Sequence, residues 1–444
     1  MTEHMEASYL FHPSQYGFRK GLSCELALNE IIDYWRESLN DKKVVASILL
    51  DLKKAFDTVD HLLVVNKLKY YNFDHQAIKM LDSYLANRSY FIFMGGIKSE
   101  SIPLNIGVPQ GSVMGPLLFI IYINDIFKLK TSSQLVLFAD DTTISFASID
   151  MSSLKTTMET DLDLLDNWLK HNRLTVNWAK TNYMCLGTKF NEEISLQFGN
   201  QQLTRVKQAR LLGVTLDDEL KLDKHIDLVC SKANRKAYLI GRKLYLFSSK
   251  YRTTLFKLFI LPNLEYCSSL FIKSSQHNID QLERCFRKNL KVFTRLSIPK
   301  GDQMEQYTLL KSANLLPLQM RLLEHFIMLI HSLLRNHKAV NIIAKLQRNN
   351  SAMNLRNSYI PPRFKSNVYK ISFNSLATRM LNELPKDLKE LSKNQTISHL
   401  NKFIKTYFRP ICITRLIIKS PVNIIICQKV YSQSLKFVAK NLKK

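Results

Sequence analysis

The chain has 444 residues, of which 46% are apolar, 23% charged and 10% aromatic. This is the composition of a globular protein, and it excludes a disordered or collagen-like chain. Residues 1–220 contain 22 Lys/Arg and 26 Asp/Glu, a net charge of −4, whereas residues 221–444 contain 41 and 11, a net charge of +30. A strongly basic half joined to a near-neutral half indicates a polyanionic partner, with nucleic acid favoured over an anionic membrane surface.

The seven cysteines argue against a zinc site or a disulfide framework. They are scattered without a CxxC pair, and Cys267, His277 and Cys285 offer only three ligands at unsuitable spacing. The N-terminus lacks the features of a signal peptide, and the longest apolar stretches, 117–123 and 411–426, are too short or too charged to span a membrane. We therefore expect an intracellular protein without a transmembrane segment. The nucleus, as an alternative to the cytoplasm, is implied only by the family resemblance given below.

The first hundred residues predict alternating helices and strands. Ser23 is a suitable N-cap for a helix whose apolar residues recur at positions 28, 32, 35 and 39. The apolar run after Lys43 predicts a strand that is buried on both faces and ends at Asp51. Residues 60–71 predict a second helix, capped by Asp60. Paired glycines at 95–96 then predict a hairpin between residues 90–94 and 97–102.

The next segment predicts a shaped loop followed by a strand hairpin. Residues 107–115 contain three glycines and a proline, and Pro116 is suited to begin a helix over 117–126. Strands are expected over 135–139 and 142–146, with Asp140-Asp141 as the turn between them. Further along, we expect a helix over 151–171 and strands over 183–186 and 211–216. Beyond residue 220 the pattern is helical and basic.

Three carboxylates could carry chemistry because of where they fall. Asp51 closes one buried strand, and Asp140 and Asp141 occupy a turn between two others. If these strands are neighbours in one sheet, the carboxylates meet at one edge, where they would repel one another unless a cation neutralises them. Mg²⁺ is the natural partner of such oxygen ligands, and two ions could support an in-line phosphoryl displacement. The alternative is an ordinary Asp-Asp turn and a solvated strand end.

Read together, six ordered segments resemble the reverse transcriptase domain of non-LTR (LINE-type, jockey-like) retrotransposons. The segments are SQYGFRKGLSCELAL (14–28), SILLDLKKAFDTVDH (47–61), GVPQGSVMGPLLFIIYINDI (107–126), LVLFADDTTI (135–144), NRLTVNWAKTNYMCLG (172–187) and ARLLGVTLDDEL…HI (209–226). Cys24, Met114 and Leu211 depart from the usual residues of these motifs. Relatives carry more fingers sequence and an endonuclease domain upstream, so the resemblance also suggests an N-terminally truncated chain.

The resemblance implies a role for each matching residue. Asp51, Asp140 and Asp141 would bind two Mg²⁺ ions, and Lys180 would protonate the leaving pyrophosphate. Phe56 would be the steric gate against a 2′-hydroxyl. The remaining positions would bind the nucleotide (Arg19, Gln110, Gly111) or form the primer grip (Leu212, Gly213). Simpler alternatives are a core position for Phe56, an exposed loop position for Arg19 and a solvated one for Lys180.

The basic half is expected to contact nucleic acid. Residues 221–300 have the helical, aromatic-interleaved character of a polymerase thumb, which could follow the phosphates of a template–primer duplex. The candidate contacts are Lys232, Arg235, Lys236, Arg242 and Lys243. The alternative for each is a solvated helix face. FNSLATRMLNELPKDL (373–388) resembles a short element that follows the polymerase in some relatives, but no role follows from it.

We therefore expect an α/β (α+β palm) right-hand polymerase with an antiparallel palm sheet. Its parts would be partial fingers (1–45), a palm (46–220) with a fingers hairpin at about 85–105, a helical thumb (221–300) and a basic helical C-terminal extension (301–444). The expected reaction is RNA-directed DNA synthesis from dNTPs on an RNA template, with a DNA primer or target DNA. The alternatives are a truncated, inactive remnant that only binds nucleic acid, a viral RNA-dependent RNA polymerase, and a basic structural or membrane-surface protein.

Overall fold

The computed structural model describes residues 1–187, 195–272, 274–299, 303–336, 338–346, 359, 362–363 and 370–383. Within it the chain forms two compact units. Unit 1 comprises residues 1–220 together with 336–345 and 362–374, and unit 2 comprises residues 221–335, 346–361 and 375–444. Each unit is described by itself.

Unit 1 is built around a five-stranded sheet with the strand order β11-β8-β1-β7-β6. The strands are β1 (Val44–Leu50), β6 (Gln134–Phe138), β7 (Asp141–Ser148), β8 (Asn182–Leu186) and β11 (Thr204–Arg205). All neighbours are antiparallel except β11 and β8. The central strand β1 is buried along six of its seven residues, as its continuous apolar sequence predicts.

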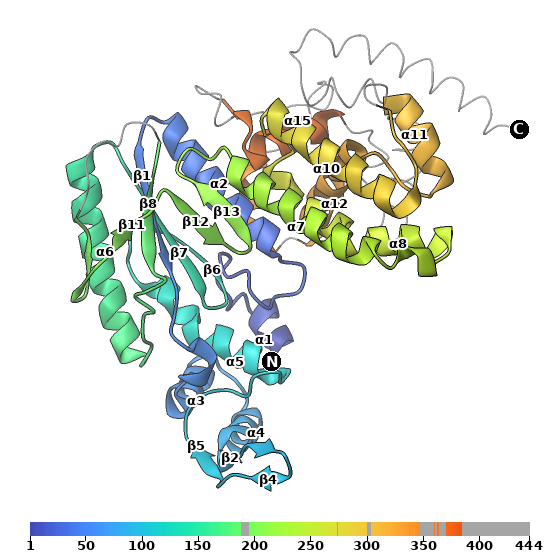
Figure 1. Ribbon diagram of the computed structural model, residues 1–444. Helices are drawn as coiled ribbons and strands as arrows, with labels where there is room; N and C mark the ends of the chain where they lie inside the picture. Colours follow the sequence, from blue (N-terminus) through green and yellow to red (C-terminus); the bar gives the residue numbers. More distant parts are fainter. Residues whose placement is uncertain are drawn as a thin grey trace, which may run out of the picture. The chain divides into compact units, whose positions relative to one another are not determined.

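Two long helices, α2 (Cys24–Asn40) and α6 (Met151–His171), cover opposite faces of this sheet. Trp35 of α2 donates its indole N–H to Ser145 of β7 at 2.8 Å. The alternate residues of β7, Ile144 and Phe146, face α6. Figure 1 shows α6 running along one side of the sheet.

The helix starts have identifiable causes. The side chains of Ser23, Asp60 and Asp150 each accept a hydrogen bond from a backbone N–H in the first turn of the helix that follows. The N-caps predicted at Ser23 and Asp60 are thereby confirmed. The remaining helices of the first 220 residues are α1 (Thr2–Ala7), α3 (His61–Tyr70), α4 (His75–Leu85) and α5 (Met114–Ile123), with 3₁₀ turns η1 (Ala55–Asp57) and η2 (Asn124–Lys128).

The predicted helix over 117–126 is displaced in the structure. Helix α5 begins at Met114 and ends at Ile123, after which the chain tightens into the 3₁₀ turn η2. The hydroxyl of Ser112 accepts the Gly115 N–H at 2.9 Å, which supports an earlier start than Pro116.

Short hairpins complete the first 220 residues. The hairpin predicted over residues 90–102 is present as two strand pairs. The single strand predicted over 211–216 is wrong, because Leu212 and Gly213 form a tight turn between two strands. Both turn residues have positive φ angles, 45° and 83°, as a two-residue hairpin turn requires. The strands are β2 (Arg88–Tyr90), β3 (Phe93–Met94), β4 (Ile97–Lys98), β5 (Ile102–Leu104), β9 (Gln197–Phe198), β10 (Gln201–Gln202), β12 (Gln208–Leu211) and β13 (Val214–Asp217).

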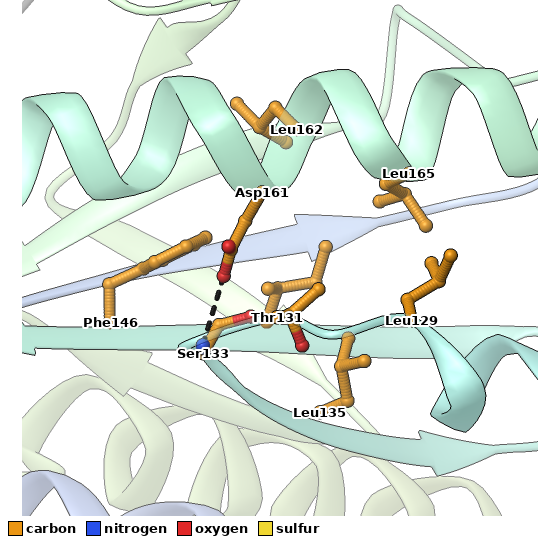
Figure 2. Close-up of a pocket in the computed structure, with 9 residues that line it drawn as sticks. Leu129, Thr131, Ser133, Leu135, Phe146, Asp161, Leu162 and Leu165 are labelled. Carbon is orange, nitrogen blue, oxygen red and sulfur yellow. Dashed lines mark hydrogen bonds between the residues drawn. The ribbon is translucent and has the colours of Figure 1, made fainter.

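A small pocket lies between α6 and the sheet, lined mainly by apolar side chains such as Leu129, Leu162 and Phe146. Figure 2 shows Asp161 of α6 reaching the end of this pocket, where it accepts the backbone N–H of Ser133 at 2.9 Å. The void holds at most about one water molecule. It is a gap in the core rather than a substrate site.

Unit 2 is helical in its described residues. Its core includes Phe256 of α8, whose ring packs against Phe286 and Phe293 of α10 at centroid distances of 5.6 and 5.8 Å. The helices are α7 (Asp223–Gly241), α8 (Ser249–Phe259), α9 (Leu261–Glu265), α10 (Gln276–Thr294), α11 (Gln303–Ser312), α12 (Leu318–Asn336) and α15 (Phe373–Glu383), with 3₁₀ turns η3 (Leu244–Leu246) and η4 (Ser268–Leu270). The first two residues of α15 and the last residue of α12 belong to unit 1, as does the short helix α13 (Val340–Lys345). No helix in the described part of the chain has the length and apolar character needed to cross a membrane.

Candidate active site

Neighbouring strands bring the three predicted aspartates to one end of the sheet. The turn between β6 and β7 is formed by Ala139 and Asp140, one residue earlier than predicted, and Asp141 is the first residue of β7. Strand β1 ends at Leu50, which pairs with Thr142 of β7, so Asp51 follows directly beside Asp141. The strands that carry these aspartates are therefore neighbours, as the family resemblance implied.

The charges of these side chains are coupled. Burial together with the neighbouring Asp140 and Asp51 carboxylates raises the pKa of Asp141 to about 6. Burial and the Asp51 carboxylate also raise the pKa of Asp140, while Lys180 opposes both shifts. The three carboxylates thus form a site where negative charge is crowded and a cation would be favoured.

The turn that carries Asp140 is fixed from the N-terminal segment. Residues 14–16 run alongside β6, with Tyr16 N–H donating to Leu137 and Leu137 N–H donating to Ser14, at 2.8 and 2.9 Å. The buried Gln15 then accepts the N–H of Ala139 at 3.1 Å. Ala139 has a φ of 57°, a left-handed conformation that surrounding contacts must hold in place.

Asp51 is held from the other side by the segment that contains Lys180. The backbone N–H of Asn177 donates to the Asp51 carbonyl at 2.8 Å, and the Asn177 side-chain amide donates to Asp51 Oδ2 at 2.7 Å. The Asp51 N–H in turn donates to the hydroxyl of Thr181 at 3.2 Å. Lys180 Nζ lies 3.8 Å from Asp51 Oδ2, and its side chain is 70% exposed. Lys180 is therefore beside the carboxylates but free to move.

The donor set suits a hard divalent cation such as Mg²⁺, because all three groups are carboxylates and burial beside neighbouring carboxylates raises the pKa values of Asp140 and Asp141. As they stand, the side chains do not converge on one point. Across the described ranges, no three His, Cys, Asp or Glu side chains are gathered closely enough to hold a metal ion. Binding would require the carboxylates to turn toward a common centre.

Three predicted nucleotide-site residues lie together. Phe56 is half-buried on η1, where its ring stacks on Phe119 at a centroid distance of 4.5 Å. Its carbonyl accepts the N–H of Val108 at 2.8 Å, which fixes the following loop beside it. In that loop Gln110 donates to Asp57 at 2.7 Å, and Gly111 has a φ of 81° with open space around its Cα. Phe56 is thus both a packed residue and the neighbour of the predicted nucleotide loop.

Arg19 is placed differently from the expectation. It is only 8% exposed and forms a two-pronged ion pair with Glu6, with N–O distances of 3.1 and 2.9 Å. A further guanidinium nitrogen donates to the carbonyls of His12 and Gln15. These contacts occupy the guanidinium in fixing the N-terminal segment, so a triphosphate would have to compete with them. The phosphate role stays a prediction that this geometry does not favour.

The other predicted residues are accounted for. Leu212 and Gly213 form the turn of the β12–β13 hairpin in unit 1. In unit 2, Lys232, Arg235, Arg242 and Lys243 are exposed, and Arg242 lies over the Tyr238 ring at 4.6 Å. Lys236 is half-buried and donates to Asn263 at 3.1 Å. Four of these five basic side chains are therefore available to a partner.

Sequence reasoning missed Asn177 and the contact of Gln15 with Ala139. Asn177 lies three residues before Lys180, in a segment that returns alongside the end of β1. An amide side chain so close to a predicted active-site lysine was a usable signal. The contact between Gln15 and Ala139 joins residues 124 positions apart and leaves no local pattern.

Comparisons with known proteins identify the domain that carries these aspartates. Residues 1–216 match the family model described as reverse transcriptase (RNA-dependent DNA polymerase). Residues 1–216 are a reverse transcriptase domain. The resemblance predicted from the six motifs is confirmed.

Two of the curated relatives come from mobile elements of Drosophila melanogaster. The probable RNA-directed DNA polymerase from transposon X-element is 25% identical over 300 residues, which are 65% of this chain and 33% of the relative. The RNA-directed DNA polymerase from mobile element jockey is 26% identical over 292 residues, or 62% of this chain and 31% of the relative. This chain spans about a third of the length of both relatives. Among solved structures, apo telomerase from Candida tropicalis is similar at 13% identity, covering 77% of this chain and 59% of that one with a TM-score of 0.38.

Proposed function

We propose that this chain is an RNA-directed DNA polymerase of a non-LTR retrotransposon. The observation that carries the proposal is the placement of Asp51 beside Asp140 and Asp141 at one end of the sheet, within the reverse transcriptase domain. The raised pKa values of Asp140 and Asp141, caused by burial and neighbouring carboxylates, support a site for divalent cations.

In this proposal the three aspartates hold two Mg²⁺ ions. The chemistry expected of such ions is activation of the primer 3′-hydroxyl and stabilisation of the leaving pyrophosphate. Lys180 acts as the proton donor to that pyrophosphate, which its exposed and mobile side chain next to Asp51 allows. The half-buried Phe56 ring excludes a ribose 2′-hydroxyl by occupying its space, and the stacking on Phe119 holds the ring rigid.

The proposed substrates are dNTPs, an RNA template and a DNA primer or target DNA. Gln110 and Gly111 would approach the incoming nucleotide, because their loop is hydrogen-bonded to Phe56 and Asp57. The turn at Leu212 and Gly213 would support the primer end. The exposed basic residues of α7 and the turn after it would follow duplex phosphates, and Arg242 on Tyr238 adds a flat surface that suits sugar or base contacts.

A primer-extension assay tests the proposal. Purified full chain should incorporate dTTP on poly(rA)/oligo(dT) in the presence of Mg²⁺, and Asp140→Ala should abolish incorporation while duplex binding persists. Equal incorporation by the two proteins would overturn the assignment of the aspartates. Duplex binding without incorporation by the wild type would instead identify a remnant that only binds nucleic acid.

A further inference from the structure

Helix α2 has a polar face that the sheet does not cover. Glu30, Asp33 and Glu37 follow one another at intervals of three and four residues, so they share one side of the helix. Glu30 and Asp33 are nevertheless buried, at 5% and 6% exposure. Glu30 accepts the hydroxyl groups of Ser14 and Tyr16. Asp33 also needs partners, because a buried carboxylate is costly without them.

The partners come from residues more than 300 positions later in the chain. The two carboxylate oxygens of Asp33 accept the backbone N–H groups of Phe373 and Asn374 at 2.7 and 2.8 Å. These are the first two residues of α15, whose N–H groups have no partner within the helix. Arg36 completes the contact by donating to the carbonyl of Ile371 at 2.9 Å. Asp33 thus caps a helix N-terminus from another part of the sequence.

A second segment covers the rest of the face. Asn341 of α13 donates to Glu30 at 2.9 Å and to the hydroxyl of Ser14 at 2.7 Å. Lys345, at the end of the same helix, pairs with Glu37. Lys338 pairs at 3.1 Å with Glu6. Two lysines therefore meet two glutamates, which is charge complementarity between the basic extension and the near-neutral first half.

A chain of hydrogen bonds connects Asn341 to the turn that carries Asp140. Asn341 holds the Ser14 hydroxyl, and the Ser14 carbonyl accepts the N–H of Leu137 in β6. The next residue, Gln15, accepts the N–H of Ala139, which directly precedes Asp140. Removing the distant segment would therefore take away one of the hydrogen bonds that hold this end of the strand, while the bond from Ser14 to Glu30 remains.

We propose that residues 338–345 and 371–374 are structural parts of the reverse transcriptase unit, docked on α2 and bracing the turn that carries Asp140. These two segments of the C-terminal extension then belong to the reverse transcriptase unit, and the start of the Phe-Asn-Ser-Leu element has a defined role. Its first two residues present their N–H groups to Asp33. The inference concerns folding and order, so it can be tested without any polymerase activity.

Hydrogen exchange on the full chain, followed by mass spectrometry, tests this docking. In Asp33→Ala we expect peptides covering 370–383 to exchange at least about tenfold faster, because two buried N–H groups lose their acceptor. Peptides covering β1 should keep their protection. Asp41→Ala is the matched control, since Asp41 is exposed just after α2 and should change neither region.

If Asp33→Ala fails to fold, β1 will also lose its protection from exchange, and a second variant that removes fewer contacts is then needed. Asn341→Ala removes only the side-chain bonds to Glu30 and Ser14, and it should speed exchange in peptides 338–346 and 134–139. Rapid exchange of 370–383 already in the wild type, or unchanged exchange at 134–139 in Asn341→Ala, would overturn the proposal. Because exchange is read without substrates, its failure is distinguishable from failure of the polymerase assignment.

Discussion

The amide of Asn177 allows a direct test of how Asp51 is aimed. In Asn177→Ala the backbone bond to the Asp51 carbonyl remains, so the segment stays paired, while the 2.7 Å bond to Oδ2 is lost. A hydrogen bond to a charged group contributes about 1.5–3 kcal/mol. Because both residues are only half-buried, we take the lower end, about 1.5–2 kcal/mol, which corresponds to roughly a 10- to 30-fold fall in rate if the loss is expressed in the transition state.

The assay is single-nucleotide primer extension over a range of Mg²⁺ concentrations. We expect a lower kcat and a higher Mg²⁺ concentration for half-maximal rate, because an unrestrained Asp51 carboxylate would spend less time facing Asp140 and Asp141. Duplex affinity should not change. Asn182→Ala is the matched control, since among the described residues that amide donates to the Lys180 carbonyl, at 3.0 Å, and not to Asp51. Rates within twofold of the wild type at every Mg²⁺ concentration, or an equal fall in the control, would refute the reasoning.

Three further outcomes follow from the same geometry. Phe56→Val should raise incorporation of ribonucleotides relative to dNTPs in primer extension, and an unchanged ratio would return Phe56 to a packing role. Gly17→Ala places a Cβ 2.3 Å from the backbone nitrogen of Ala139. We therefore expect the free energy of unfolding, measured by thermal unfolding, to fall by about 1–3 kcal/mol and polymerisation to slow. Wild-type stability would contradict the close approach. Burial and the Arg19 charge lower the pKa of His12 to about 4, and its Nδ1 accepts the Ser14 N–H. Because the pKa of His12 in the folded state lies below the ordinary 6.5, its contribution to the free energy of unfolding is retained above pH 6.5 and lost as the pH falls toward 4. In urea unfolding between pH 7 and 5, the wild type should therefore lose at most about 2 kcal/mol more than His12→Asn. Equal losses in the two proteins would contradict this.

The sequence predicts best where one local pattern determines the structure. The continuous apolar run before Asp51 predicted a strand covered on both faces, and the two apolar runs around Asp140 and Asp141 predicted a hairpin; both are present, with the turn one residue earlier than predicted. Their adjacency in the sheet followed from the family resemblance. Helix caps at Ser23 and Asp60 were predictable for the same local reason.

Local patterns failed where the backbone conformation or a distant partner decides the outcome. Residues 211–216 look like one apolar strand, yet the positive φ angles of Leu212 and Gly213 turn the chain back on itself. The phosphate role of Arg19 stays a prediction, and no local pattern indicates that Arg19 forms an ion pair with Glu6. No local pattern indicates that Asp33 of α2 is buried, because its partners lie at Phe373 and Asn374.

The elements that carry the aspartates are held by neutral groups rather than by fixed positive charges, and this has a chemical reason. Asn177 restrains Asp51 through an amide, and Gln15 restrains the turn before Asp140 through another amide. A guanidinium in either place would fix the geometry equally well, but it would also neutralise the carboxylates and compete with a cation. The nearby Lys180 is the exception, and it is 3.8 Å away on a 70% exposed side chain that can withdraw. Rigid positioning and uncompensated negative charge are therefore combined at this end of the sheet, which is the condition that binding of divalent metal ions requires.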